Sequence, residues 1–538
     1  VEIYTEGSDS QEAFTVQQQY DVGKVDPYFH NLMIASETRT ADKVINRATM
    51  TYEACDLSAV PSNSALTAAG RMPIKWICTT ASSEETIEGL PDQAKTTRTT
   101  MEYDGYGNVI KEVNEGILSL DGDEMTTEMT YAQPNDDRWI LGLVVTEQMY
   151  RDASGDKTLT TNYYDGADFT GLAAGEYTHG FLSRQTVKAD DSTTLEPVRQ
   201  RRDDYGNVIE TIDATGDVSD ATQHRRRYVF DDFGLFILKT ELLNGDYLLA
   251  RHSRYDYNYQ KVTYLTDWLV EKGGEEQSAR LETNVQFDGL GRELKRAEPG
   301  DSLDAPTREV TYELADPTSR IGVKSRSERN LSAPDEEMYI CLDGRGRVYQ
   351  QRTRLASGEY LVSGFTIYNS RGAIVETYQP YTSSSSECEE EAPQGVLSSK
   401  NKFDALFRPL EITLPDADIY GDASITRFEY EPFLERIYDR EDNDATSPHA
   451  NTPTLREMDG LGRLIRITRD GGDGELFDYR LQYDNTGSFE GYTDPAGNTQ
   501  TLVVDLAGRT TEVENANFGK ITYAYNAMGQ LTRKQDAR

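Results

Sequence analysis

The chain has 538 residues, a net charge of −38 and an apolar content of 37%. This length exceeds what one ordinary compact core holds, so we expect several domains or a repeat array. The charge argues against nucleic acid and anionic membranes as direct partners, because phosphate binding needs clustered lysine and arginine. The sequence contains no run of ~18 apolar residues, which predicts a chain without a membrane-spanning helix.

Residues 1–100 predict a β-rich N-terminal part with one weak repeat. Tyr20-Asp21-Val22-Gly23 places an aromatic residue before Asp and Gly, but it is one residue shorter than the later copies. The four cysteines of the chain, Cys55, Cys78, Cys341 and Cys388, lack CxxC spacing, so a zinc site is disfavoured. A disulfide between Cys55 and Cys78 is one alternative for this pair.

Residues 101–538 repeat one short motif: an aromatic or large apolar residue, then Asp or Asn, then Gly three residues later. The ten full copies begin at Tyr103, Ile212, Phe230, Phe287, Leu342, Tyr368, Met458, Tyr483, Val504 and Tyr525. Imperfect copies begin at Arg202, Phe403 and Thr493. A motif repeated this often predicts an array built from one supersecondary unit. We expect this array to form the wall of a β structure.

Each residue type in the motif has a mechanical reason. The aromatic residue suits the end of a half-buried strand, Asp caps its own turn, and Gly supplies the positive φ of a tight turn. The motif therefore predicts one β-hairpin per copy and a chain with less than about a tenth helix. We expect positive φ at several of Gly107, Gly206, Gly291, Gly346, Gly462 and Gly508. We expect rings that lie in strands, are substantially buried and stack repeat on repeat at Tyr103, Phe230, Phe287, Tyr368, Phe403, Tyr483 and Tyr525.

The spacing of the copies indicates a common unit. Phe287 and Leu342 are 55 residues apart, whereas Met458 and Tyr483 are 25 apart, so two short intervals make about one long interval. Long intervals therefore predict two hairpins whose middle turn has lost the motif. Asn244-Gly245 is such a middle turn, because Asn-Gly between apolar residues is a strong hairpin signal.

Two polar insertions interrupt the array, at residues 382–391 and 439–444. Both predict solvated loops between hairpins rather than domain boundaries. Residues 439–444 and 470–475 also offer carboxylate ligands for Ca²⁺, but neither follows EF-hand spacing, and turns in solvent are the favoured interpretation.

Residues with catalytic chemistry are scattered. The five histidines are His30, His179, His224, His252 and His449. They form no HExxH motif, and the chain has neither a nucleophile elbow nor a phosphate-binding loop. The basic run Arg225-Arg226-Arg227 is expected to alternate faces on a strand and to pair with acidic neighbours. We therefore predict no catalytic, cofactor-binding or metal-binding residues and no cofactor.

These motif copies resemble the YD repeats of the RHS-repeat superfamily, which includes polymorphic bacterial toxins, the B and C components of insecticidal toxin complexes, and teneurins. Asp26–His30 and Trp139–Gly142 are also similar to segments of toxin-complex B components. The resemblance implies an all-β fold in which a strip of hairpins spirals into a hollow shell or a partial shell. In the toxins such a shell holds a variable C-terminal effector.

The chain departs from that family near its end. The string most similar to the Asp-Pro-x-Gly-Leu motif of the family's plug domain is Asp494-Pro495-Ala496-Gly497-Asn498, which lacks the Leu. It is in phase with its neighbours, so an ordinary turn is favoured over a remnant of self-cleavage. We expect neither a plug nor an effector in this chain.

The resemblance implies a non-enzymatic, secreted or cell-surface wall whose partner is a protein cargo or a second shell subunit. The alternative is an adhesion module of teneurin-like type, for which carbohydrate is the partner. A hydrolase with a site built from loop carboxylates is the third and least favoured hypothesis.

Overall fold

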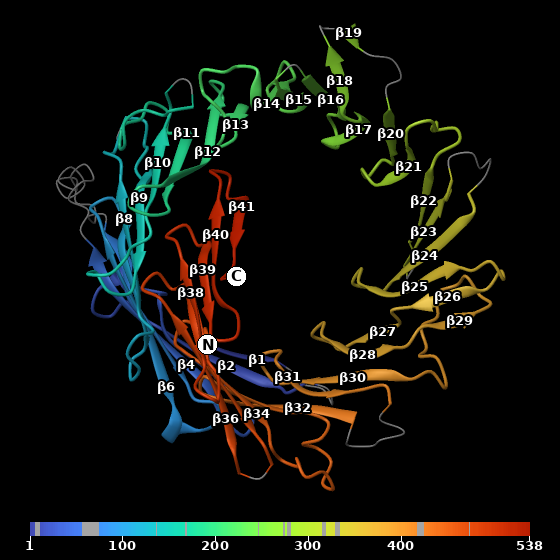
Figure 1. Ribbon diagram of the computed structural model, residues 1–538. Helices are drawn as coiled ribbons and strands as arrows, with labels where there is room; N and C mark the ends of the chain where they lie inside the picture. Colours follow the sequence, from blue (N-terminus) through green and yellow to red (C-terminus); the bar gives the residue numbers. More distant parts are fainter. Residues whose placement is uncertain are drawn as a thin grey trace. The chain divides into compact units, whose positions relative to one another are not determined.

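The computed structural model describes residues 1–5, 11–55, 75–135, 137–166, 169–245, 247–272, 275–276, 281–314, 319–328, 334–416, 424–472 and 474–537. Almost all regular structure in these ranges is β-strand (Figure 1). The helical residues among them are two three-residue 3-10 turns, η1 (Pro27–Phe29) and η2 (Pro91–Gln93), and Ser424. The prediction of an all-β chain with less than a tenth helix is confirmed.

The chain divides into two compact units. Unit 1 comprises Val1–Arg199, Phe403–Glu411 and Ile425–Arg538, and unit 2 comprises Gln200–Lys402 and Ile412–Ser424. Unit 1 therefore joins two segments that lie far apart in the sequence. The predicted boundary between residues 100 and 101 stays a prediction.

The N-terminal strands of unit 1 form an antiparallel meander in which each strand pairs with the next one along the chain. These strands are β1 (Glu2–Thr5), β2 (Phe14–Tyr20), β3 (Met33–Arg39), β4 (Val44–Cys55), β5 (Trp76–Thr86), β6 (Lys95–Tyr103), β7 (Val109–Ile117), β8 (Met125–Tyr131), β9 (Val144–Tyr150), β10 (Thr160–Tyr164), β11 (Leu182–Lys188) and β12 (Thr194–Arg202).

The strands that follow are antiparallel too, but their order branches where β16 pairs with β18 while β17 pairs with β20. They are β13 (Val208–Ile212), β14 (Gln223–Phe230), β15 (Ile237–Asn244), β16 (Tyr247–Asp256), β17 (Lys261–Thr266), β18 (Leu269–Lys272), β19 (Glu275–Glu276), β20 (Glu282–Phe287), β21 (Glu293–Ala297), β22 (Arg308–Glu313), β23 (Ser319–Ser325), β24 (Glu336–Leu342), β25 (Val348–Arg354), β26 (Tyr360–Ser363), β27 (Thr366–Tyr368), β28 (Ile374–Tyr378), β29 (Tyr381–Ser383), β30 (Ser398–Phe403) and β31 (Pro409–Thr413). The Asn244-Gly245 turn joins β15 to β16, so the prediction of a hairpin there is confirmed.

The C-terminal strands of unit 1 form a second antiparallel meander, which we call the C-terminal strip. They are β32 (Ile425–Glu431), β33 (Leu434–Tyr438), β34 (Thr454–Met458), β35 (Leu464–Asp470), β36 (Leu476–Tyr483), β37 (Phe489–Thr493), β38 (Thr499–Val504), β39 (Thr510–Asn515), β40 (Gly519–Tyr525) and β41 (Leu531–Gln535).

Eight of the ten full motifs produce the same hairpin. The aromatic residue ends its strand at a register shift, as Tyr103 does opposite Val109. The Gly107 N–H donates to the Asp104 carbonyl and the Asp104 N–H to the Asn108 carbonyl, which is a type I turn followed by a glycine bulge. Gly107 has φ +93°, and the other five glycines of the prediction have φ between +74° and +89°. The predicted turn glycines are confirmed.

Two full motifs differ from this hairpin. The motif at Ile212 instead leads into a longer connection in which the Asp213 N–H donates to the His224 carbonyl, and the motif at Phe230 has a turn one residue longer. The prediction of one hairpin per copy is therefore wrong at Ile212.

Candidate functional site

The motif turns are held by a carboxylate that accepts several hydrogen bonds at once. In the repeat that begins at Met458, Asp459 Oδ1 accepts from the Leu461 and Arg463 N–H groups at 3.0 and 2.8 Å. Its Oδ2 accepts from Arg463 Nε at 2.7 Å. Asp459 is 1% exposed, so this network satisfies a buried carboxylate within five residues of chain.

The same arginine links its turn to the next motif. The Arg463 guanidinium lies 4.5 Å from the centroid of the Tyr483 ring, and the Tyr483 hydroxyl donates to the Leu464 carbonyl at 3.0 Å. The tyrosine of one hairpin is thereby attached to the arginine and to the first strand residue of the preceding motif. Cation–π and hydrogen-bond contacts of this kind contribute about 0.5–1.5 kcal/mol each.

This arrangement of Asp, Arg and a following Tyr recurs, and we call it the turn module. The modules are Asp288–Arg292–Tyr312, Asp343–Arg347–Tyr368, Asp404–Arg408–Tyr430, Asp459–Arg463–Tyr483 and Asp505–Arg509–Tyr525. In other copies Asn replaces Arg and uses its amide, as Asn108 does in donating to Asp104 Oδ2 and to the Leu141 carbonyl.

In two of the modules, those of Asp288 and Asp343, the surroundings favour the ionised carboxylate. Hydrogen bonds from the backbone and side chain of Arg292 lower the pKa of Asp288 against the opposing effect of burial. Burial alone would raise the pKa of Asp343, but hydrogen bonds from Arg347 outweigh it and lower that pKa. Burial raises the pKa of the Tyr483 phenol, which therefore remains a donor.

The seven motif aromatics named in the sequence analysis each end a strand, as predicted. Their rings are substantially buried, as predicted, although none is fully buried. The motifs of Leu342 and Tyr368 are linked by the Arg347 guanidinium, which lies over the Tyr368 ring. The contact between these two motifs is therefore cation–π rather than the expected stacking of one ring on another. The physical reason for this contact is that an arginine side chain can cover a ring while its charged group still reaches water.

A second feature of unit 1 is the line of contacts between its two distant segments, which we call the seam. It joins residues 11–189 to residues 403–508. The first contact is a parallel bridge between Gln11 and Phe403, in which the Glu12 N–H donates to the Phe403 carbonyl at 3.1 Å. Beside it, Arg408 forms a bidentate ion pair with Glu88, at 2.8 and 2.9 Å.

The next seam contact is a close approach of backbones. The carboxylate Oδ2 of Asp123 accepts from the Ile117 N–H at 2.9 Å and from the Gly460 N–H at 2.7 Å. A Cβ on Gly460 would lie 2.4 Å from the Gly116 carbonyl carbon. Only glycine therefore fits this turn as it stands, and Asp123, which is 2% exposed, joins both sides.

Two further contacts continue the seam toward the C-terminus. Asn485 accepts from the Asp152 N–H through Oδ1 at 2.8 Å and donates to the Asp152 and Asp156 carbonyls. The Arg151 N–H donates to the Asn485 carbonyl at 2.7 Å. The Leu506 N–H donates to the Ala189 carbonyl at 2.8 Å.

These contacts form an ordered series. On the N-terminal side they use the connections after β5, β7, β9 and β11, which lie at one edge of the meander. On the C-terminal side they use the motif turns that begin at Asp404, Asp459, Asp484 and Asp505, and both series ascend in the sequence together. The seam therefore joins two rows of turns within unit 1.

The residues that the sequence offered for chemistry lie apart from one another. His224 Nδ1 lies 2.9 Å from Asp213 and His252 Nε2 lies 3.1 Å from Glu271, on different strands. Arg225 and Arg227 both contact the buried Glu210, whereas Arg226 is exposed, so the basic run alternates faces as predicted.

The proposed cation ligands are engaged in local turns. Asp442 Oδ1 accepts from the N–H and hydroxyl of Thr452, both at 2.9 Å, and its Oδ2 accepts from the Asp439 N–H. Asp494 caps its own turn in the same way as the other motifs. Asp473 lies outside the described residues. Within the described ranges no group of three or more His, Cys, Asp or Glu side chains is placed to hold a metal ion.

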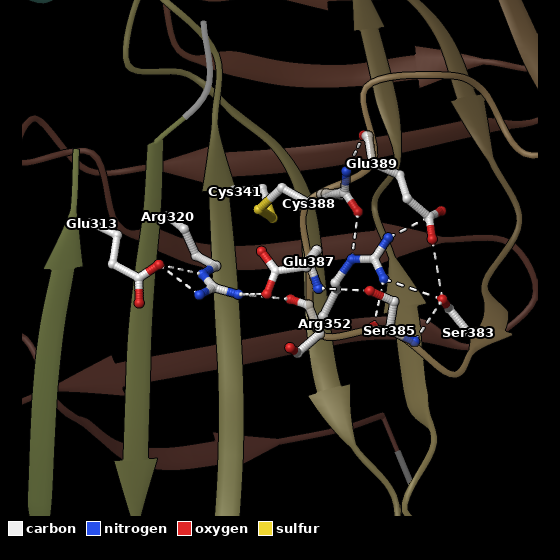
Figure 2. Close-up of a disulfide and its surroundings, with 11 residues drawn as sticks. Glu313, Arg320, Cys341, Arg352, Ser383, Ser385, Glu387, Cys388 and Glu389 are labelled. Carbon is white, nitrogen blue, oxygen red and sulfur yellow. Dashed lines mark hydrogen bonds and ion pairs between the residues drawn. A yellow bond between two sulfur atoms is a disulfide. The ribbon is translucent and has the colours of Figure 1, made fainter. Parts of the chain in front are cut away.

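Sequence reasoning missed one covalent link. Cys55 and Cys78 are joined, as the sequence allowed, and Cys341 and Cys388 form a second disulfide. The even number of cysteines was the available signal. The second bond also corrects the interpretation of residues 382–391 as a solvated loop, because this segment is tied to β24 and packs over the buried Arg352 (Figure 2).

Comparisons with known proteins place the fold. Solved structures of TcdB2-TccC3 match over 99% of this chain, with a TM-score of 0.75 and 14% identity. TcdB2-TccC3 without its hypervariable C-terminal region gives a TM-score of 0.75 at 12% identity, and the Photorhabdus luminescens Tc holotoxin pore gives 0.73 at 11%.

The chain spans about a third of the length of these toxin chains, covering 33%, 37% and 36% of them respectively. No protein-family model matches the sequence. No curated protein matches it either. The likeness therefore shows the fold, an all-β structure of long antiparallel hairpin sheets such as these toxin chains contain. No helix in the part of the chain that the structure describes is long and apolar enough to cross a membrane.

Proposed function

We propose that this chain is a wall section of an RHS-repeat, toxin-complex-like secreted protein, and that it encloses and protects a polypeptide cargo without catalysing a reaction. The observation that carries the proposal is the seam. The motif turns of Asp404, Asp459, Asp484 and Asp505 dock on every second connection of the N-terminal meander, from β5 to β11, which closes one row of turns against another.

A seam of this kind serves enclosure better than adhesion. An adhesive surface needs an exposed recognition patch, whereas the seam buries carboxylates and backbone donors between two segments of the same wall. Glu88, Asp123, Asp404 and Asp459 are each at most 5% exposed. Burying them has a desolvation cost, which the paired arginine and backbone N–H groups offset.

The fold likeness supports the same function. The toxin chains that share the fold include a TcdB2-TccC3 without its hypervariable C-terminal region, so this fold and a hypervariable C-terminal region belong to the same protein there. The net charge of −38 suits a secreted wall that must stay soluble, because like charges keep long β surfaces from associating. A protein cargo or a partner shell subunit is the partner that this function requires.

The test is protection of a cargo. The chain is co-expressed with a candidate cargo, supplied either as the sequence that its gene encodes after Arg538, where there is one, or as a partner component. We expect the cargo to co-purify and to resist a protease that digests it when it is free. The matched variant is Arg408→Met, which removes the cation of the Arg408–Glu88 ion pair in the seam. This variant should increase the rate of cargo cleavage.

A cargo that stays fully protease-sensitive beside the folded chain would reject enclosure. Binding of the chain to glycan arrays or to cell surfaces, with no protected cargo, would instead support the adhesion alternative and carbohydrate as the partner.

A further inference from the structure

The segment after β29 is attached to unit 2 without strand pairing. Residues 384–391, which we call the strap, carry no β-strand and connect β29 to the chain that leads to β30. Cys388 of the strap is disulfide-bonded to Cys341 near the end of β24, with 5.8 Å between the Cα atoms. Cys341 is fully buried, whereas Cys388 is partly exposed.

The strap supplies the partners of a fully buried arginine. Arg352 on β25 is 0% exposed, and its Nη1 donates to the Ser385 carbonyl at 2.8 Å and to Ser383 Oγ at 3.3 Å (Figure 2). Its Nη2 lies 3.0 Å from Glu389 Oε2, an ion pair whose geometry is outside that of a hydrogen bond. Gln350, also fully buried, accepts from Arg352 Nε at 2.8 Å.

The carboxylate of Glu389 and the guanidinium of Arg352 stabilise each other in their charged forms. Burial would raise the pKa of Glu389, but Arg352 outweighs it and holds that pKa below its ordinary value of 4.5. A second strap residue, Glu387, pairs with Arg320 at 3.0 Å, and the Ser386 carbonyl accepts from the same guanidinium. The strap therefore supplies the counter-charge of the buried Arg352 and one of the two carboxylates that pair with Arg320, the other being Glu313.

An apolar cluster lies beneath the strap. Cys341, Tyr349 and Phe365 are buried together, with Tyr381 and Cys388 packed against them. A cavity of 290 Å³ next to this cluster is lined by Tyr349, Phe365, Tyr368 and the strap residue Glu390. The cavity is already open to solvent, so movement of the strap would newly expose Arg352 and the buried rings.

The other disulfide has a different setting. Cys55 and Cys78 lie on β4 and β5, which pair antiparallel along ten residues of register, with Cys55 opposite Trp76 and Cys78 opposite Glu53. Ladder hydrogen bonds hold these two strands together whether or not the sulfur atoms are joined. The strap has no ladder of this kind and is held by its disulfide together with side-chain contacts, such as those of Arg352 with the Ser385 carbonyl and of Arg320 with Glu387.

From this contrast we propose that the Cys341–Cys388 disulfide is a redox latch, which closes the strap over Arg352 in an oxidising compartment and releases it when the bond is reduced. The reductant is a dithiol. Its thiolate attacks the partly exposed Cys388 sulfur, forms a mixed disulfide and expels Cys341 as a thiolate, which takes up a proton.

The second thiol of the reductant then attacks the mixed disulfide and releases Cys388, so two electrons and two protons pass from the dithiol to the two cysteines. When the strap moves away, Arg352 loses its counter-charge, and hydration of the guanidinium then becomes more favourable than its burial. The latch concerns unit 2 by itself and does not depend on the enclosure of a cargo.

The experiment uses the full chain and a glutamate-specific protease, because the strap contains Glu387, Glu389, Glu390 and Glu391. Cleavage is measured before and after reduction with dithiothreitol, and alkylation with mass spectrometry reports which cysteines are free. We expect reduction of Cys341–Cys388 to increase strap cleavage at least tenfold and to raise amide exchange in residues 381–391. The strand signal in far-UV circular dichroism should be retained.

Two paired variants separate the latch from a general loss of stability. Cys341→Ser with Cys388→Ser should be cleaved in the strap without any reductant, whereas Cys55→Ser with Cys78→Ser should be cleaved there only after reduction. Arg352→Met in the oxidised chain should leave the strap protected, because the disulfide still closes it. Unchanged protection of the strap after complete reduction of the bond would overturn the latch. Loss of the strand signal on reduction would overturn it as well, because the bond would then hold the whole fold.

Discussion

The two segments of unit 1 share one fold but are stabilised in different ways. The N-terminal meander has the longer strands, with 12 residues in β4 and 11 in β5, and it buries Ile45, Ile87 and Ile117. The C-terminal strip has strands of five to eight residues. Among its described residues no hydrophobic side chain is buried, and Asp442, Asp459 and Thr468 are buried instead.

This difference shows that a β strip can be ordered without a core of its own. The C-terminal strip is held by turn modules along its length and by the seam at one edge, and both are polar. Arg463, for example, contacts the carboxylate of its own turn and the ring of the next hairpin. If this description is correct, the strip should be sensitive to polar and glycine substitutions that an ordinary β surface tolerates.

The largest effect is expected at Arg408, the module arginine that also serves the seam. Arg408→Met leaves the carboxylates of Glu88 and Asp404, 5% and 1% exposed, without their cation. Removing one partner of a buried pair costs about 3–5 kcal/mol. Urea unfolding of the full chain, followed by amide exchange at residues 84–90, measures this loss.

The matched control for this variant is Arg292→Met. Arg292 makes the same contacts with Asp288 and Tyr312, but among the described residues it faces no counterpart of Glu88. Its substitution should destabilise the chain by no more than about 1–1.5 kcal/mol. Equal effects at the two positions would mean that the seam adds nothing to the module.

The next effect concerns the close approach at Gly460. Gly460→Ala places a methyl group 2.3 Å from the Ile117 nitrogen, so the strip must move away from the meander. Such overpacking costs about 1–3 kcal/mol. Faster amide exchange at residues 116–123 in the variant would report the loss of contact.

Gly289→Ala is the control for this second substitution. Gly289 occupies the same place in the repeat of Phe287, and a Cβ there meets no atom within 4 Å. This variant should unfold at the same urea concentration as the parent chain. Destabilisation of both variants by the same amount would show that the turn, and not the seam, requires glycine.

A smaller effect is expected from the hydroxyl groups that join one hairpin to the next. Tyr483→Phe removes the hydrogen bond to the Leu464 carbonyl but keeps the ring under Arg463. The expected loss is about 0.5–1.5 kcal/mol, measured as a shift of the urea midpoint. Tyr205→Phe, at a ring that is 85% exposed, should produce no shift. A neutral Tyr483→Phe would show that the ring alone carries the contact.

The smallest effect depends on pH. Hydrogen bonds from Arg466 and Thr468 lower the pKa of Asp478 below its ordinary value of 3.8. A lowered pKa stabilises the folded chain above the unfolded-state pKa, and the stabilisation is lost as the pH falls through the folded-state pKa. Asp478→Asn should therefore cost about 0.2–1 kcal/mol at pH 7, and the cost should shrink as the pH falls below 3.8 and through the lowered folded-state pKa. A cost that stays constant down to pH 2 would contradict this linkage.

The sequence by itself determined the local structure of this protein. Its motif names the strand end, the capping carboxylate and the turn glycine, and these are short-range effects that five consecutive residues decide. Gly107 with φ +93° and the Asn244-Gly245 hairpin follow from such local rules. The alternation of Arg225, Arg226 and Arg227 does so as well.

Only the tertiary structure decided which turns meet. The contact of Asp123 with Gly460 spans 337 residues, and that of Glu88 with Arg408 spans 320. The motif gives every repeat the same local sequence, so no repeat carries a signal that names its partner. The sequence does not specify the pairing of Cys341 with Cys388 either, because four cysteines allow three pairings. Long-range partners depend on how the strip coils, which is a property of the summed strand twist and of the packing of many hairpins, and not of any one motif.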